Sequence, residues 1–295
     1  GNLVAVISNG TAVLGLGTWS MGGRDLPDPD NDDERDIAAI RAAFDAGITH
    51  IDTAEIYAAG HTEELVGEAI ADLPREKLFI TSKVATYHLR YDQVLAAAEG
   101  SLKRLGLKYL DLYLIHGPAP EVPLKETMRA MAKLREQGLI RNIGVSNFIP
   151  ELIAEAQKFC SYRIVNNQIN YSLEARGHDE VGTLEYCAKN QILVMAYRPL
   201  AKGVFSVEGQ QMLQKLGQKY QKPPLAVALN WVLGKPNVVA LVKTSNPQHL
   251  RENLVALGWR LDSEDEQALD ERFPAGETMG VGSPARTRRP PVRKW

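Results

Sequence analysis

Short apolar runs rich in β-branched residues recur along the chain, with amphipathic segments between them. This pattern is typical of strands that alternate with helices, and it predicts parallel βαβ units. Such a chain forms either an open doubly wound sheet or a closed barrel. We count eight runs, at residues 13–18, 49–53, 78–83, 110–116, 142–147, 165–170, 192–198 and 238–244.

The residues at the ends of these runs favour the barrel. In a (β/α)8 barrel, the carboxyl ends of all strands meet at one rim, where active sites are built. An open dinucleotide-binding sheet would instead carry GxGxxG after its first strand, and the segment 15–20 lacks the third glycine. We therefore predict an α/β chain folded as a (β/α)8 TIM barrel. The polar or amphipathic residues at its strand ends are Trp19, Asp52, Lys83, His116, Ser146, Asn147, Gln168, Tyr197 and Lys243.

The segments outside the strands predict additions to this barrel. Residues 3–10 read as a hairpin that caps one end, because Asn9-Gly10 suits a tight turn. We expect extra helices between residues 200 and 236 and in the C-terminal region. No linker marks a boundary, so residues 1–295 are predicted to form a single domain, with a basic C-terminal tail at residues 276–295.

Two local signals mark the starts of C-terminal helices. Asn246-Pro247 predicts an N-cap followed by the first helical residue. Ser263 and Glu266 have the spacing of a capping box, so a helix is expected to open there.

Composition excludes several classes of function. The net charge of −2 gives no general attraction to nucleic acid, and no apolar run reaches the roughly 18 residues that span a bilayer. Cys160 and Cys187 have no CxxC partner, so neither a disulfide framework nor a thiolate metal site is expected. We predict a cytoplasmic monomer without nucleic-acid, membrane or metal partners.

Three of the strand-end residues have a shared chemical logic with Tyr57, which follows the second run. A tyrosine with an ordinary pKa near 10 is a poor proton donor at neutral pH unless a cation favours its phenolate. Lys83 supplies that cation for Tyr57, and Asp52 keeps the lysine charged. His116 adds a donor that holds a carbonyl oxygen. We therefore predict that these four residues form a site for carbonyl reduction, in which the carbonyl oxygen is protonated.

The motifs around these residues resemble those of the aldo-keto reductase family. The matching segments are residues 47–54 (GITHIDTA) with Tyr57 and Gly67, then 112–116 (LYLIH), 144–148 (GVSNF) and 196–200 (AYRPL). The resemblance implies that Tyr57 is the general acid, that Lys83 and Asp52 lower its pKa, and that His116 orients a small carbonyl substrate. Trp19, Tyr57 and His116 would line the substrate site.

The same resemblance implies NADPH bound in extended form, without a Rossmann fold. Ser146, Asn147 and Gln168 would bind the nicotinamide carboxamide, and Tyr197 would stack on the ring. Lys243 and Thr244 would hold the 2′-phosphate. The full set of cofactor-binding residues implied is Gly17, Thr18, Trp19, Ser146, Asn147, Gln168, Tyr197, Arg198, Leu200, Lys243, Thr244, Ser245, His249, Glu252 and Asn253.

Three positions depart from the family pattern. His249 stands where an arginine usually clamps the phosphate, so NADH is an additional candidate cofactor. Arg198 replaces a common serine beside the pyrophosphate, and Gly117 replaces an aromatic residue after His116, which opens the substrate mouth.

Two other functions are compatible with the same residues. The chain could be a Schiff-base lyase on the same barrel, with Lys83 as the nucleophile. It could also be a non-catalytic NADPH-binding subunit that senses redox state. The reductase interpretation is preferred because all four candidate catalytic residues are present.

Overall fold

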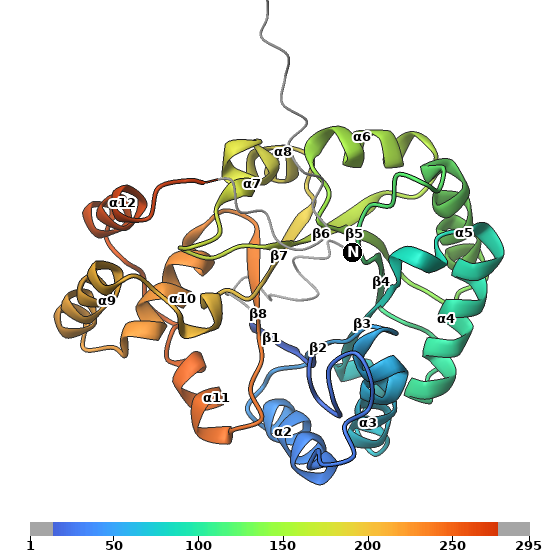
Figure 1. Cartoon of the computed structure of the whole chain (residues 1–295), viewed down its shortest axis with the longest axis horizontal. Helices are drawn as coiled ribbons and strands as arrows, with labels where there is room; N and C mark the ends of the chain where they lie inside the picture. The colour runs from blue at the N-terminus through green and yellow to red at the C-terminus, as the bar shows by residue number, and fades with distance from the viewer. Residues whose placement is uncertain (1–13, 277–295) are drawn as a thin grey trace, which may run out of the picture.

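The computed structural model describes residues 14–276, and its eight parallel strands form a closed barrel in chain order (Figure 1). The barrel closes because β8 pairs with β1. Both the TIM-barrel prediction and the eight predicted strand positions are confirmed. The predicted hairpin at residues 3–10 and the tail from residue 277 onward lie outside the described residues. The strands are β1 Leu14–Gly17, β2 His50–Asp52, β3 Phe79–Val84, β4 Leu112–Ile115, β5 Ile143–Ser146, β6 Ile164–Asn170, β7 Leu193–Tyr197 and β8 Val238–Val242.

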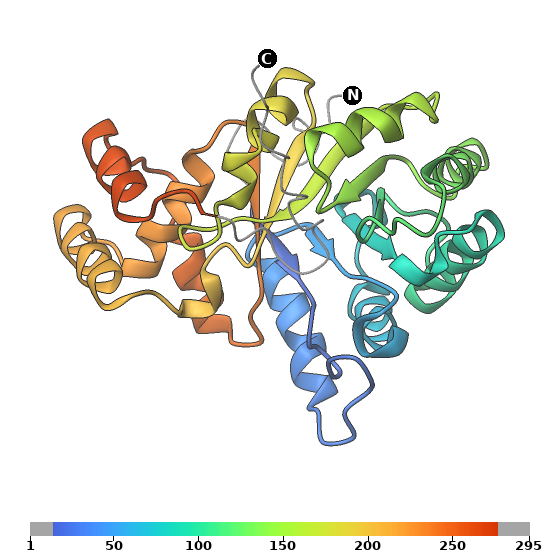
Figure 2. The ribbon, with the colours of Figure 1, turned by 45° about the horizontal axis from the view of Figure 1, so that its top comes forward.

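Helices surround the barrel, as Figures 1 and 2 show. The predicted extra helices are confirmed, because α9 and α10 both lie between β7 and β8, and α12 packs against α9. Within residues 14–276, no helix is long and apolar enough to cross a membrane. The α-helices are α2 Asp33–Asp45, α3 His61–Ile70, α4 Tyr91–Leu105, α5 Leu124–Glu136, α6 Pro150–Lys158, α7 Gly177–Glu180, α8 Thr183–Lys189, α9 Val207–Tyr220, α10 Pro224–Gly234, α11 Pro247–Leu254 and α12 Ser263–Arg272. Short 3-10 helices are η1 Tyr57–Gly60, η2 Arg75–Lys77, η3 Thr86–His88 and η4 Ala201–Gly203.

The two predicted helix starts have different outcomes. The side chain of Asn246 caps α11 by accepting a hydrogen bond from the backbone of Gln248, as predicted. Helix α12 does begin at Ser263, but the predicted capping box is wrong, because Asp262 is the cap and accepts from the backbone of Asp265. The residue before the predicted cap has a side chain of the same capping class and the extended backbone that a cap requires.

Alternation along the strands separates two cores. On β4, Tyr113 and Ile115 face the surrounding helices, whereas the alternate residues Leu112 and Leu114 face the barrel interior. Lys83 lies opposite Leu114 in the β3–β4 register, so it shares this inward direction. The inward cluster of buried residues consists of Phe79, Leu112, Leu114, Leu193, Met195, Val239 and Leu241. Polar residues such as Lys83 occupy inward positions near the carboxyl ends of the strands, next to this apolar cluster.

Gly15 is required by close packing inside the barrel. A Cβ atom at Gly15 would lie 2.5 Å from Nδ1 of His50 and 2.7 Å from Cδ2 of Leu241. We expect Gly15→Ala to lower the free energy of unfolding by about 1 to 3 kcal/mol, because overpacking forces neighbouring side chains to move. Gly17→Ala is the matched control in the same strand, since its Cβ would meet no atom nearer than 3.8 Å, from Val242. Urea unfolding of both variants checks this, and equal losses would contradict it.

Candidate active site

Lys83 lies at the centre of the candidate site. It is a fully buried residue of β3, and its Nζ atom donates to Asp52 Oδ1 at 2.6 Å, to the Thr53 carbonyl at 2.8 Å and to the Tyr57 hydroxyl at 3.1 Å. An ammonium group has three hydrogens, so these three acceptors use all of them. The lysine therefore connects Asp52 to Tyr57, as the sequence predicted.

Tyr57 is held in place by an unusual stretch of backbone. It begins η1 after β2, and Ala58 and Ala59 that follow have positive φ angles of 46° and 52°. The amide of Ala58 donates to the carbonyl of Arg24 at 2.6 Å, which ties this turn to the loop after β1. Such conformations cost energy for residues other than glycine and cluster at functional sites. The turn therefore fixes the tyrosine toward Lys83.

The pKa of Tyr57 is set by opposing effects. Burial raises this pKa, the charge of Lys83 lowers it, and the charge of Asp52 raises it, with a net value above the ordinary one. Lys83 thus lowers the pKa as predicted, but the direct effect of Asp52 is opposite, and desolvation of the phenolate outweighs the lysine. Tyr57 consequently keeps its proton at neutral pH, which a proton donor requires.

His116 completes the tetrad from the end of β4. Its ring meets the ring of Tyr57 edge to face, with 5.8 Å between the centroids. Burial and, to a smaller extent, the charge of Lys83 lower the pKa of His116 to about 3, so the imidazole is neutral. Its Nδ1 atom is buried without a hydrogen-bond partner among residues 14–276. A neutral imidazole offers one donor, which suits a carbonyl oxygen beside Tyr57.

The predicted nicotinamide-binding residues form a second network beside the first. Ser146 Oγ donates to the Gln168 carbonyl at 2.9 Å, and Tyr197 donates its hydroxyl proton to Asn147 Oδ1 at 3.0 Å. Gln168 Nε2 donates to Asp52 Oδ2 at 2.7 Å. The structure thus brings all four residues together, and Gln168 joins them to the tetrad. Sequence reasoning missed this bond, because no local pattern links residues 116 positions apart.

The loops after β1 and β7 supply further predicted residues. Thr18 is fully buried, and its hydroxyl donates to the Asp52 carbonyl at 3.0 Å, so it supports Asp52 from β1. The guanidinium of Arg198 lies 5.3 Å from the ring centroid of Trp19. Gly17 ends β1, and Leu200 packs against the outer core. Trp19 and Arg198 are partly exposed, so both remain available to ligands.

The remaining predicted cofactor residues lie after β8. Lys243 Nζ donates to Ser245 Oγ at 3.2 Å, and Thr244 Oγ1 donates to the Asn246 carbonyl at 3.1 Å. In the described chain, no hydrogen bond joins this group to the tetrad, so it forms a separate part of the site. The residues predicted on α11 are His249, Glu252 and Asn253, of which His249 and Glu252 are exposed.

One residue at this rim was not predicted. Asp36 on α2 is buried, and its Oδ1 atom accepts a hydrogen bond from Ser245 Oγ at 2.7 Å. The two residues are 209 positions apart, and nothing in the sequence around Asp36 marks it. The position of Asp36 beside Ser245 is therefore seen only in the folded structure.

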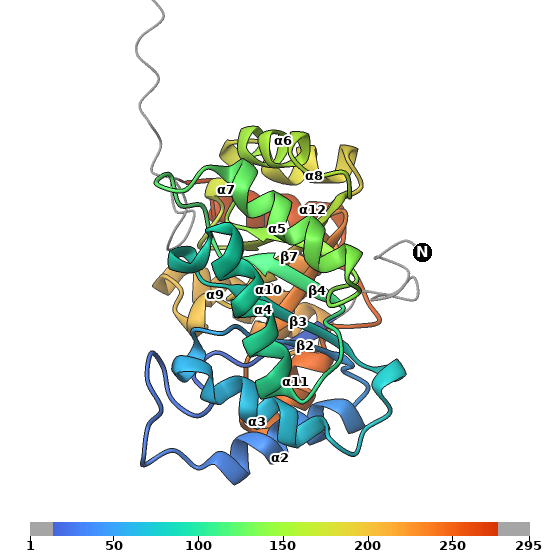
Figure 3. The same cartoon turned by 90° about the vertical axis from the view of Figure 1, so that its right-hand side faces the viewer.

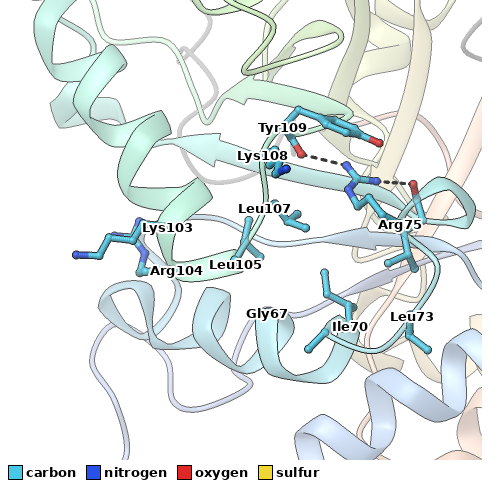
Figure 4. Close-up of a pocket in the computed structure, with 13 residues that line it drawn as sticks. Gly67, Ile70, Leu73, Arg75, Lys103, Arg104, Leu105, Leu107, Lys108 and Tyr109 are labelled. Atoms are coloured by element: carbon cyan, nitrogen blue, oxygen red, sulfur yellow. Dashed lines mark hydrogen bonds between the residues drawn. The ribbon is translucent and has the colours of Figure 1, made fainter.

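A groove of about 480 Å³ lies elsewhere on the molecule, between α3, η2 and α4, and Figure 4 shows the residues that line it. Its residues Leu78 and Tyr109 precede β3 and β4, so the groove lies at the opposite ends of these strands from the tetrad. Arg75 is occupied there by Asp111 at 2.6 Å and by the Tyr109 carbonyl at 3.0 Å. The described residues of the chain also include no group of three His, Cys, Asp or Glu residues placed to hold a metal ion. We therefore assign the candidate site to the tetrad.

Comparison with known sequences points to one family. The model of the aldo/keto reductase family matches residues 13–272. Methylglyoxal reductase YeaE of Escherichia coli is 36% identical over 269 residues, which cover 89% of this chain and 91% of that protein. A 9,11-endoperoxide prostaglandin H2 reductase of Trypanosoma cruzi is 34% identical, over 88% of this chain and 86% of that protein.

Solved structures give the same family. A thermostable aldo-keto reductase in complex with the inhibitor epalrestat is 46% identical, with a TM-score of 0.85 over 88% of this chain and 94% of that one. An aldo/keto reductase from Klebsiella pneumoniae in complex with NADP and acetate is 36% identical, with a TM-score of 0.81 over 90% and 93% of the two chains. The likeness thus covers the barrel and nearly all of its sequence.

Proposed function

The chain belongs to the aldo/keto reductase family, and from this premise we propose that it reduces an aldehyde or ketone with NADPH, using Tyr57 as the general acid. One observation carries the proposal. Lys83 Nζ contacts both the Tyr57 hydroxyl at 3.1 Å and Asp52 Oδ1 at 2.6 Å, so a proton donor, a cation and a counter-charge are aligned. Carbonyl reduction needs this arrangement, because the oxygen gains negative charge as the carbon accepts hydride.

Each residue of the tetrad has a defined part in the chemistry. NADPH, when bound, supplies the hydride that forms the new C–H bond. Tyr57 gives its hydroxyl proton to the carbonyl oxygen, which receives the electron pair of the C=O π bond. Lys83 stabilises the phenolate that remains, and Asp52 keeps Lys83 charged. Neutral His116 donates a hydrogen bond to the same oxygen and fixes its position.

The second network fits a nicotinamide ring. Because Gln168 uses its Nε2 atom on Asp52, its Oε1 atom remains as an acceptor for the carboxamide. The hydroxyl bond from Tyr197 to Asn147 fixes the tilt of the partly exposed aromatic ring. A fixed ring restricts a stacked nicotinamide to one face, which hydride transfer requires. These residues hold and orient the cofactor in our proposal.

Lys243 is proposed to hold the 2′-phosphate of NADPH. Desolvation lowers its pKa and the charge of Asp36 raises it, with a net value below the ordinary one. Lys243→Ala is expected to weaken NADPH binding by about 1.5 to 3 kcal/mol, the size of a charge-assisted contact, while NADH binding changes much less. Fluorescence titration of both cofactors measures this. Lys215→Ala, at an exposed position on α9, is the control, and equal losses for NADPH and NADH would refute the assignment.

The Schiff-base lyase is disfavoured by the surroundings of Lys83. Its three hydrogens are all used, and its pKa is raised, because the Asp52 and Tyr57 contacts outweigh desolvation. Schiff-base formation needs a neutral amine with a free lone pair. We expect no covalent adduct on Lys83 after borohydride treatment with a carbonyl substrate, as read by mass spectrometry.

The reductase proposal is tested directly by loss of NADPH absorbance. Aldehydes, keto sugars, dicarbonyls and keto steroids form the panel, with methylglyoxal first, because a relative is named for its reduction. Turnover excludes the non-catalytic redox sensor, whereas cofactor binding without turnover of any compound would favour it.

We also propose that the chain acts as a single-domain cytoplasmic monomer. Both cysteines are buried free thiols, which is compatible with a reducing compartment. Light scattering coupled to size exclusion measures the mass in solution against the 32.6 kDa of one chain.

A further inference from the structure

The carboxylate of Asp36 lies against the loop that follows β8. Helix α2, which carries this residue, packs beside α11, and Figures 1 and 3 show the two helices adjacent. Asp36 is only 5% exposed, and its Oδ1 atom accepts from Ser245 Oγ at 2.7 Å. A buried negative charge thus borders the loop that we propose for the 2′-phosphate.

The hydrogen of the Ser245 hydroxyl is committed. It has a single hydrogen, which it donates to Asp36, and its oxygen accepts from Lys243 Nζ at 3.2 Å. Ser245 therefore presents no hydrogen to a phosphate oxygen. Lys243 has two further hydrogens that can bind a phosphate. However, the negative charge of Asp36 interacts with the ammonium group of Lys243 and offsets part of its attraction for an anion.

Asp36 is fixed in this position. Its Oδ2 atom accepts from the backbone amide of Gly22 at 3.0 Å and from Asn31 Nδ2 at 2.9 Å. With the bond from Ser245, three donors from two loops hold the carboxylate. It cannot turn away when a phosphate enters, so the repulsion between the two anions is not relieved by rotation.

We propose that Asp36 is a specificity-determining residue that reduces the preference of this chain for NADPH over NADH. It acts by repelling the 2′-phosphate and by withholding the Ser245 proton from it. The 2′-hydroxyl of NADH carries no charge and meets no such repulsion. This inference rests on the proposed placement of the 2′-phosphate beside Lys243.

Asp36→Asn tests the proposal with little change in shape. The new amide oxygen can accept from Gly22 and Asn31, while the new NH2 group donates to Ser245 and releases its hydroxyl hydrogen. We expect the Kd of NADPH to fall roughly five- to twentyfold, the range of a charge-dependent coupling, and the Kd of NADH to change less than about twofold. Glu34→Gln removes an equal charge from an exposed position of the same helix and is expected to change neither Kd.

Asp36→Ser is the second variant if Asp36→Asn does not fold, because it also removes the charge and keeps a short polar side chain. The same fall in the Kd of NADPH relative to that of NADH is expected. Where Asp36→Asn folds, combining it with Ser245→Ala is expected to remove part of the gain, which a double-mutant cycle measures. An unchanged NADPH to NADH ratio in a folded Asp36 variant would overturn the proposal.

These outcomes are separate from failure of the proposed function. Absence of NADPH oxidation in the wild-type chain would refute the reductase whatever the Kd ratios are. Equal losses of both cofactors in Lys243→Ala would refute the phosphate placement, and with it the role of Asp36.

Discussion

Tyr57→Phe is expected to lower kcat for carbonyl reduction by about a hundredfold or more, while the Kd of NADPH changes less than about twofold. The substitution removes only the hydroxyl, which receives a hydrogen bond from Lys83 at 3.1 Å. The aromatic ring remains to pack against His116, so the site keeps its shape. Steady-state kinetics with the best substrate of the panel, together with fluorescence titration of NADPH, separate chemistry from binding.

Tyr87→Phe is the matched control for this experiment. Tyr87 is 66% exposed in η3, after the neighbouring strand β3, and loses an equivalent hydroxyl. Its variant should turn over at the wild-type rate. Turnover of Tyr57→Phe within a few fold of wild type would exclude Tyr57 as the proton donor.

Much of the tetrad could be predicted because it depends on strand alternation and topology. Asp52, Lys83 and His116 each follow an apolar run, and parallel strands in a closed barrel bring such ends together. Tyr57 is different, since it lies beyond the strand in a turn with two left-handed alanines. Alanine gives no sequence signal for a positive φ angle, so the turn that directs Tyr57 toward Lys83 could not be predicted.

Contacts between distant side chains could not be predicted in the same way. Alternation tells which face of a strand a residue occupies, but not which side chain it meets across the barrel. The Gln168–Asp52 and Asp36–Ser245 bonds therefore appear only in the structure. The net direction of the Tyr57 pKa could not be predicted for a related reason, because the balance between burial and Lys83 depends on how much water the fold excludes.

The bond from Gln168 to Asp52 links the two halves of the site. Asp52 uses Oδ1 for Lys83 and Oδ2 for Gln168, so one carboxylate fixes both the cation and a proposed nicotinamide ligand. A shift of Asp52 would disturb the proton donor and the hydride donor together. Geometric coupling of this kind is valuable where two reacting groups must meet within a fraction of an ångström.

Lys83→Met is expected to lower kcat by about a hundredfold or more and to shift the pH dependence of the reverse reaction. In alcohol oxidation, the Tyr57 phenolate accepts the proton, so the rate rises with pH until the Tyr57 pKa is passed. Lys83 lowers that pKa against the effect of burial, and its removal therefore moves the rise to higher pH. Reduction needs the protonated tyrosine, so its rate should stay independent of Tyr57 ionisation at neutral pH in both proteins.

The stability of this variant has to be measured beside its kinetics. Removal of Lys83 leaves Asp52 as a buried charge without a cation, which typically costs about 3 to 5 kcal/mol. The double variant Lys83→Met with Asp52→Asn removes both charges, so it restores folding while the cation is still absent. Profiles of oxidation rate against pH for wild type and both variants give the result. An unchanged profile would contradict the role of Lys83 and would point to Arg198, whose charge also lowers the pKa of Tyr57.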